Sequence, residues 1–173
     1  MNQCHINFGA EFGDILAANE RYAALFRDSE LTGVAAKGLA IVTCMDSRIA
    51  PLAILGMMPG DVKILRNAGA RVTEDVLRTL VLANHLLGVN RVLVMPHTDC
   101  RMALAAEAEM HAAIFEASGI DSRGIEIRSV SDQAAALVLD VTRVRAYPLL
   151  SKSLVVGGAI FDVHTGRLIP QDL

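Results

Sequence analysis

The 173-residue sequence contains no tryptophan, and only 4% of its residues are aromatic. Proteins that bind single-stranded nucleic acid stack the bases on aromatic side chains, so this composition argues against such a platform. The net charge of −3 and the absence of any run rich in Lys and Arg point the same way. We therefore expect no nucleic-acid partner.

A secretion signal and a membrane-spanning segment are not recognisable in the sequence. The first residues, Met1–His5, do not show the basic-then-apolar pattern of a signal peptide. The apolar stretches are interrupted by polar residues well before they reach the length that crosses a bilayer. We therefore expect a cytoplasmic protein with no membrane partner.

The cysteine count argues against a disulfide framework. The chain has three cysteines, Cys4, Cys44 and Cys100, which is an odd number. In a cytoplasmic protein such cysteines serve metal binding or catalysis, or are simply buried. We expect Cys4, close to the N-terminus, to be incidental.

Hydrophobic residues make up 53% of the chain, which is enough for a packed core in one domain. Short apolar runs, typical of strands buried on both faces, alternate with stretches that carry apolar residues at helical spacing. This alternation predicts an α/β fold, a single domain with a mainly parallel central sheet flanked by helices. We expect strands at 39–43, 62–65, 91–95 and, late in the chain, 154–156 with 159–161, and helices at 10–28, 50–57, 73–88, 102–117 and from about Ser131 to Pro148.

Residues that can bind a metal follow two of the predicted strands. Cys44 comes directly after the strand at 39–43, and His97 and Cys100 come just after the strand at 91–95. Because the carboxyl ends of parallel strands meet at one edge of a sheet, we expect the two clusters to lie close together. Two thiolates and one imidazole suit zinc and leave a fourth position over.

Other interpretations of these residues stay open at this point. A single H-x-x-C match is weak evidence, and a buried cysteine is usually only a small hydrophobic residue. Zinc held by three protein ligands is the catalytic pattern, whereas four protein ligands form a closed structural site. Asp46 could supply the fourth ligand or stand aside for water.

Three short motifs follow one another along the chain: Cys44-Met45-Asp46-Ser47-Arg48, then Arg66-Asn67-Ala68-Gly69, then His97-Thr98-Asp99-Cys100. They resemble the pattern C-x-D-x-R, then R-N-A-G, then H-x-x-C of the β-class carbonic anhydrases, in particular the small prokaryotic branch. The resemblance resumes at 158–166. The resemblance covers most of the chain, and three motifs in this order are together highly specific.

The resemblance implies an enzyme that reversibly hydrates carbon dioxide to bicarbonate and a proton, a carbonate dehydratase. It implies Zn²⁺ as the cofactor, held by Cys44, His97 and Cys100. It also implies that Asp46 and Arg48 act as a catalytic pair, in which Asp46 orients the attacking hydroxide.

The resemblance has implications for substrate binding and for assembly as well. Asn67, Ala68 and Gly69 are expected to border the substrate pocket. The N-terminal helix is expected to extend to a partner chain, which makes a homodimer or a larger homo-oligomer the expected state. On this basis the chain divides into an N-terminal helical arm at 1–38 and a zinc-binding catalytic domain at 39–173.

One departure and three alternatives accompany this interpretation. The family usually has glycine after the second cysteine, where this chain has Arg101. One alternative function is a related zinc hydrolase on the same scaffold, for example one that attacks carbon disulfide. Another is a zinc-binding homologue with weakened catalysis. A dinucleotide-binding domain is disfavoured because no G-x-G-x-x-G follows the first strand.

Overall fold

The computed structural model describes residues 8–173, so the prediction for Cys4 lies outside the described residues. The chain forms two compact units, one that ends at Thr32 and one that runs from Gly33 to Leu173. Among the described residues, no helix combines the length and the apolar character needed to span a bilayer.

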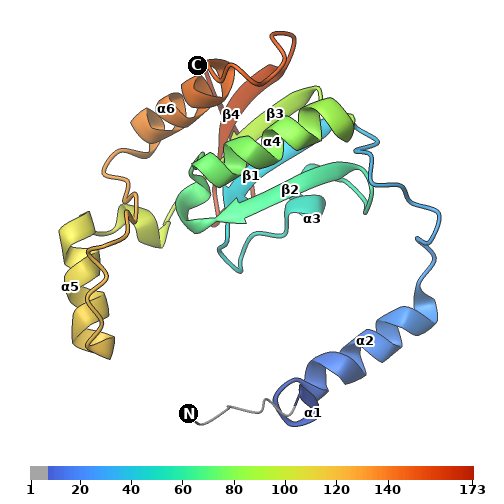
Figure 1. Cartoon of the computed structure of the whole chain (residues 1–173), viewed down its shortest axis with the longest axis horizontal. Coiled ribbons are helices and arrows are strands. Elements are labelled where there is room, and N and C mark those ends of the chain that lie inside the picture. Colours follow the sequence, from blue (N-terminus) through green and yellow to red (C-terminus); the bar gives the residue numbers. More distant parts are fainter. Residues whose placement is uncertain (1–7) are drawn as a thin grey trace. The chain divides into compact units, whose positions relative to one another are not determined.

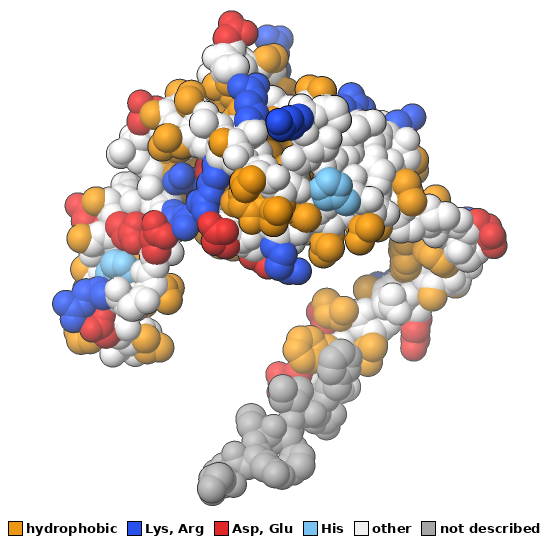
Figure 2. Space-filling view, turned by 45° about the horizontal axis from the view of Figure 1, so that its top comes forward, with side chains coloured by type: hydrophobic (Ala, Val, Ile, Leu, Met, Phe, Trp, Pro, Cys, Tyr) orange, Lys and Arg blue, Asp and Glu red, His pale blue; other side chains and the backbone are white. Residues whose placement is uncertain are grey.

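The first unit is helical, but its helix is interrupted. Where the sequence predicts one helix over 10–28, the structure has α1 (Phe8–Glu11) and α2 (Gly13–Leu25). The helix breaks at Phe12, which has a φ of −129°, and it ends because Phe26 is extended. None of the residues of α2 is buried, and Figure 2 shows hydrophobic side chains on the surface of this helical segment. The exposed apolar side chains of this unit include Ile15, Leu16, Tyr22 and Leu25.

The second unit is built on a five-stranded sheet with the strand order β2-β1-β3-β4-β5 (Figure 1). The first four of these strands run parallel and β5 runs antiparallel to β4, which confirms the predicted α/β fold with a mainly parallel sheet. The sequence did not predict β5, because its Pro170 is unusual in a strand and is tolerated here at the sheet edge. The strands are β1 (Leu39–Cys44), β2 (Val62–Asn67), β3 (Arg91–Met95), β4 (Val155–Phe161) and β5 (Leu168–Gln171).

Two long helices begin and end close to the predicted positions. α4 (Glu74–Leu86) is capped by Thr73 and α6 (Gln133–Arg145) by Asp132. Each capping side chain accepts a hydrogen bond from the backbone N–H three residues further on, at 3.4 and 3.0 Å respectively. α4 stops before Gly88, whose φ of 75° favours glycine.

The helix predicted over 102–117 begins later than expected. The chain first forms the 3-10 turn η2 (Arg101–Ala103), and α5 (Glu107–Ser118) starts only afterwards. The carboxylate of Glu109 accepts a hydrogen bond from the backbone N–H of the residue before α5, at 2.9 Å, and so fixes the helix start. The predicted start was wrong because the alanines that favour a helix also occupy the preceding turn.

The core reaches the carboxyl ends of the strands. All six residues of β1 are buried, as expected for a parallel strand covered on both faces. Buried side chains of α4 and α6 belong to the larger core cluster, and Figure 1 shows α4 lying across the sheet. A second cluster holds Cys44, Cys100 and Ile49, which precedes α3 (Pro51–Leu55). Two of the predicted metal ligands are therefore part of a packed core.

Candidate metal centre

The three predicted ligands come together at the carboxyl ends of β1 and β3. Cys44 is the last residue of β1, and His97 lies two residues beyond the end of β3. β1 and β3 are adjacent parallel strands, so their carboxyl ends are neighbours in the sheet. A bridge between His97 and Phe161 of β4 fixes the segment further.

The geometry of these side chains fits a zinc ion. The ligand atoms of Cys44, His97 and Cys100 lie within 4.8 Å of one another, and all three residues are buried. The two sulfur atoms are 3.9 Å apart. A tetrahedral zinc with bonds of about 2.3 Å separates two sulfur ligands by roughly 3.8 Å. Within residues 8–173, no other group of three or more His, Cys, Asp and Glu side chains is arranged to hold a metal.

His97 directs one ring nitrogen to the same place. Its Nδ1 lies 2.8 Å from the carbonyl oxygen of Thr98, and since a carbonyl can only accept, Nδ1 carries the proton. The lone pair is therefore on Nε2, which is buried and makes no hydrogen bond to any described residue. A buried polar atom without a partner costs free energy, and a metal ion would satisfy it.

The two cysteines influence each other's protonation. Contact with Cys100 is the main cause that lowers the pKa of Cys44, with help from His97 and the N–H of Gly69 and against the effect of burial. The pKa of Cys100 is raised, first by the contact with Cys44 and then by burial. The contact therefore favours one thiolate in the pair over two, and a divalent cation favours the thiolate form of both.

Asp46 and Arg48 form a bidentate ion pair beside the ligands. Arg48 Nε donates to Asp46 Oδ1 at 3.0 Å, and Nη2 donates to Oδ2 at 2.8 Å. These hydrogen bonds hold the pKa of the Asp46 carboxyl well below its usual value. Asp46 Oδ2 is also 3.8 Å from His97 Nε2, so the carboxylate lies next to the ligand group while Arg48 holds it. The role of Asp46 as a fourth ligand stays a prediction.

Asp99 is a partner of Arg48 that the sequence analysis missed. Arg48 Nη1 donates to the Asp99 carboxylate at 2.8 Å, and Nη2 donates to the Asp99 carbonyl at 3.0 Å. Asp99 has a φ of 55°, a left-handed conformation that aspartate tolerates better than most residues. Arg48 thus connects Asp46 to the segment that carries His97 and Cys100. The position of Asp99 between two predicted ligands was the available signal, and it did not identify the partner.

The R-N-A-G motif supports the segment that carries Cys44. Arg66 Nε donates to the Cys44 carbonyl at 2.9 Å, and Nη2 donates to the Asp46 carbonyl at 2.7 Å. The N–H of Gly69, in the 3-10 turn η1 (Ala68–Ala70), donates to Cys44 Sγ at 3.4 Å. The motif therefore contacts both the backbone and the sulfur of a predicted ligand.

The residues predicted to border the substrate pocket lie in this same loop. Asn67 makes two hydrogen bonds with the backbone of Arg71, at 2.7 and 2.9 Å. Ala68 packs against the core cluster that contains Cys44. Arg101, which replaces the usual glycine, is exposed. The role of Asn67, Ala68 and Gly69 in substrate binding stays a prediction.

Comparison with known proteins identifies relatives along nearly the whole chain. A family model described as carbonic anhydrase matches residues 39–121. The β-carbonic anhydrase 1 of Mycobacterium tuberculosis is 34% identical over 155 residues, which cover 90% of this chain and 94% of the relative. A crystal structure of carbonic anhydrase from Streptococcus mutans has a TM-score of 0.88 and 34% identity, over 93% of this chain and 97% of that chain. A carbon disulfide hydrolase of an Acidianus species is 29% identical over 75% of both chains.

The fold and the ligand group define a class of protein, an α/β metalloprotein with a Cys–His–Cys site at the carboxyl ends of parallel strands. The 34% identity to known carbonic anhydrases, over at least 90% of this chain, identifies the family more narrowly. The chain belongs to the β-carbonic anhydrase family. The proteins of this family are zinc enzymes, and the buried ligand group gives zinc two sulfurs and one nitrogen.

Proposed function

We propose that this chain catalyses the reversible hydration of carbon dioxide to bicarbonate and a proton, with zinc held by Cys44, His97 and Cys100. The observation that supports this most strongly is the carboxylate of Asp46, which Arg48 holds by hydrogen bonds beside three buried ligand candidates. A site with three protein ligands keeps a position for water, which is the arrangement of catalytic rather than structural zinc.

The residues around the ligands have separate tasks in this reaction. Zinc would supply water of lowered pKa, and so a hydroxide nucleophile near neutral pH. Asp46 stays ionised because Arg48 hydrogen-bonds it, so its oxygens can only accept. With zinc bound, Asp46 Oδ2 would accept the hydrogen of the nucleophile and so orient it toward the carbon of carbon dioxide. Asp99 keeps Arg48 in place through two further hydrogen bonds.

The loop after β2 is proposed as the wall of the substrate pocket. Asn67, Ala68 and Gly69 lie where the chain passes the sulfur of Cys44. Carbon dioxide carries no net charge and needs a small apolar space, which Ala68 and Gly69 can provide. Asn67 shapes this wall through its hydrogen bonds to the backbone of Arg71.

We further propose a cytoplasmic homodimer or larger homo-oligomer. In this proposal 1–38 is an arm that extends to a partner chain, and 39–173 is the catalytic domain. The support is α2 (Gly13–Leu25), which buries none of its residues although it carries Ile15 and Leu16. Cover by a second copy would remove these side chains from water.

Carbon disulfide hydrolysis is the second candidate function. The relative from an Acidianus species carries that name at 29% identity. The substrate is also a linear molecule with an electrophilic carbon, so the same ligands and the same carboxylate could serve both reactions. The higher identity and the near-complete coverage of the carbonic anhydrase relatives favour carbon dioxide.

The deciding experiment is stopped-flow hydration of carbon dioxide by protein of known zinc content. We expect one zinc per chain and hydration well above the uncatalysed rate. Cys100→Ser replaces a thiolate with a poor ligand, so it should lose most of the bound zinc and most of the hydration activity. Cys4→Ser is the matched control and should keep both the zinc and the activity. Zinc-loaded protein that hydrolyses carbon disulfide but does not hydrate carbon dioxide would establish the second candidate instead.

A further inference from the structure

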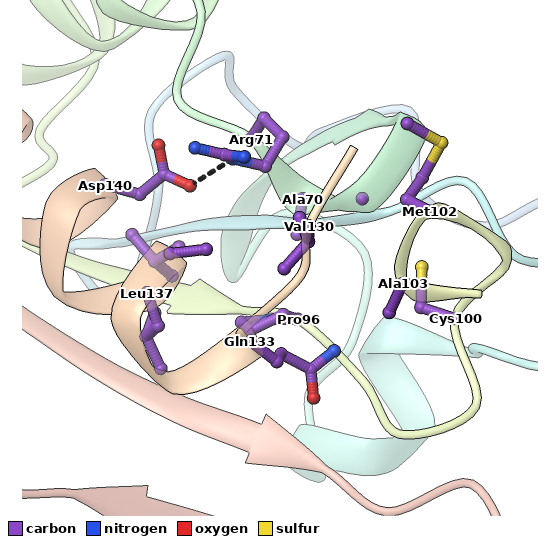
Figure 3. Close-up of a pocket in the computed structure, with 13 residues that line it drawn as sticks. Ala70, Arg71, Pro96, Cys100, Met102, Ala103, Val130, Gln133, Leu137 and Asp140 are labelled. Carbon is purple, nitrogen blue, oxygen red and sulfur yellow. Dashed lines mark hydrogen bonds and ion pairs between the residues drawn. The ribbon is translucent and has the colours of Figure 1, made fainter. Parts of the chain in front are cut away.

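Helix α6 directs polar side chains of one face toward the metal centre. Gln133 Nε2 donates to the carbonyl oxygen of His97. Asp140 lies two helical turns further along, on the same face as Gln133 and Leu137. Together with Cys100 and Met102 these three residues line a small cavity of about 10 Å³ (Figure 3). A helix distant in sequence from the ligands therefore lines a cavity together with one of them, Cys100, and contacts the backbone of another, His97.

Asp140 is a buried carboxylate with two partners on the loop after β2. Only 5% of the residue is exposed. Its Oδ2 accepts a hydrogen bond from Arg71 Nε at 2.7 Å, drawn as a dashed line in Figure 3, and its Oδ1 accepts one from the Val72 N–H at 3.1 Å. A carboxylate is costly to bury unless it is paired and hydrogen-bonded, so this arrangement holds the loop firmly.

The loop between Asn67 and Arg71 is held in a strained conformation. Gly69 and Ala70 both have a left-handed backbone, with φ of 77° and 59°. This costs little at glycine, but Ala70 carries a Cβ and pays for the conformation, which persists only where the surroundings enforce it. The Asn67 side chain closes the loop from one end, through its two hydrogen bonds to the Arg71 backbone. Asp140 holds the other end.

The strained part of the loop is the part that touches a metal ligand. The N–H of Gly69 donates to Cys44 Sγ at 3.4 Å. A Cβ at Gly69 would lie 3.2 Å from Met102, so the loop is also tightly packed against η2. Relaxation of the loop toward ordinary backbone angles would change the direction of the Gly69 N–H.

We propose that Asp140, paired with Arg71, is a positioning residue for the metal centre, because it holds the loop so that the Gly69 N–H stays on the sulfur of Cys44. The hydrogen bond draws negative charge from the thiolate and fixes its orientation, and so sets the affinity for the metal. This inference rests on the proposed role of Cys44 as a zinc ligand. Partners of this kind, one step removed from the metal, typically change affinity or activity by about 10-fold to 100-fold when they are lost.

The test compares variants by metal binding rather than by activity alone. Asp140→Asn should lower zinc affinity, measured by competition with a chromophoric chelator, by about 10-fold. In cobalt-substituted protein it should also shift the thiolate-to-cobalt charge-transfer band. In wild-type protein loaded with cadmium-113, the amide proton of Gly69 should show a scalar coupling to the metal through the sulfur, and the variant should lose this coupling.

The matched control is Val141→Ala, next to Asp140 on the same helix and fully buried in the larger core cluster. It should lower thermal stability but leave the affinity, the band and the coupling unchanged. The double variant Arg71→Met/Asp140→Asn leaves no unpaired buried charge, and it replaces Asp140→Asn if that variant does not fold. If Asp140→Asn, or the double variant in its place, kept the wild-type zinc affinity, charge-transfer band and cadmium coupling, the inference would be overturned. Failure of the proposed function would appear separately, as wild-type protein that binds zinc and shows the coupling but does not hydrate carbon dioxide.

Discussion

Helices α2 and α4 have the same length, 13 residues, but are stabilised in different ways. α4 (Glu74–Leu86) buries four of its side chains and is capped by Thr73, whereas α2 (Gly13–Leu25) buries none and has no side-chain cap. A helix of this length is only marginally stable alone in water. α4 therefore belongs to the core of its own unit, and α2 depends on cover, which we propose a second copy provides.

The largest effect expected from this comparison concerns one leucine in each of the two helices. Leu80 of α4 is fully buried, so Leu80→Ala should lower the free energy of unfolding by about 2–5 kcal/mol. Leu16 of α2 is exposed, so Leu16→Ala should change it by less than about 0.5 kcal/mol when the protein is dilute enough to be monomeric. Urea denaturation measures both. Equal losses would mean that α2 is packed within the chain, contrary to this comparison.

A second prediction separates the catalytic pair from surface charge in general. Arg48→Ala removes the hydrogen bonds that hold Asp46, and we expect zinc to be retained while hydration at neutral pH falls on the order of 100-fold, or about 2.7 kcal/mol. Arg78→Ala is the matched control, because Arg78 is also exposed and pairs with Asp75 on α4. Full activity of Arg48→Ala with zinc bound would exclude the pair from the mechanism.

The same contrast explains what the sequence could predict. The grouping of the ligand candidates was predictable because Cys44 and His97 follow buried apolar strands whose carboxyl ends must meet. The helix over 10–28 was only partly predictable, since its apolar residues have helical spacing but no core of their own to fix its ends. Asp140 was not predictable, because its partner Arg71 is 69 residues away and no short motif connects them. Local patterns identify elements and ligands, whereas tertiary hydrogen bonds require the fold.

A smaller effect is expected at the helix caps. Thr73→Ala removes the side-chain cap of α4 and should cost about 1 kcal/mol of stability. Phe12, at the matching position before α2, provides no such hydrogen bond, so Phe12→Ala should not show this loss. Thermal unfolding followed by circular dichroism measures both changes. If Phe12→Ala lowered the stability as much as Thr73→Ala does, the assignment of the caps would be contradicted.

The smallest effect concerns α5 (Glu107–Ser118), which also has no buried residue but is tied to its unit by a carboxylate. Glu107 accepts hydrogen bonds from the N–H groups of Ile127 and Arg128, at 2.9 and 3.2 Å. The Ile127 bond is the main cause that lowers the pKa of Glu107 below its ordinary value of 4.5. A lowered pKa means that the link is fully present above about pH 4.5 and is lost as the pH falls through the lower folded value.

Acidification should therefore release the segment that follows α5 before the core unfolds. Amide exchange at Ile127 and Arg128, corrected for the intrinsic effect of pH, should accelerate as the pH falls below the ordinary value of 4.5. Glu107→Gln should show fast exchange at pH 6 already and little further pH dependence, because the neutral amide is a weaker acceptor. Glu116→Gln, on the same helix, should behave as wild type, which also controls for loss of zinc in acid. If Glu107→Gln kept the wild-type pH dependence, the carboxylate would not be what anchors α5, and α5 would resemble α2 in depending on cover from outside its unit.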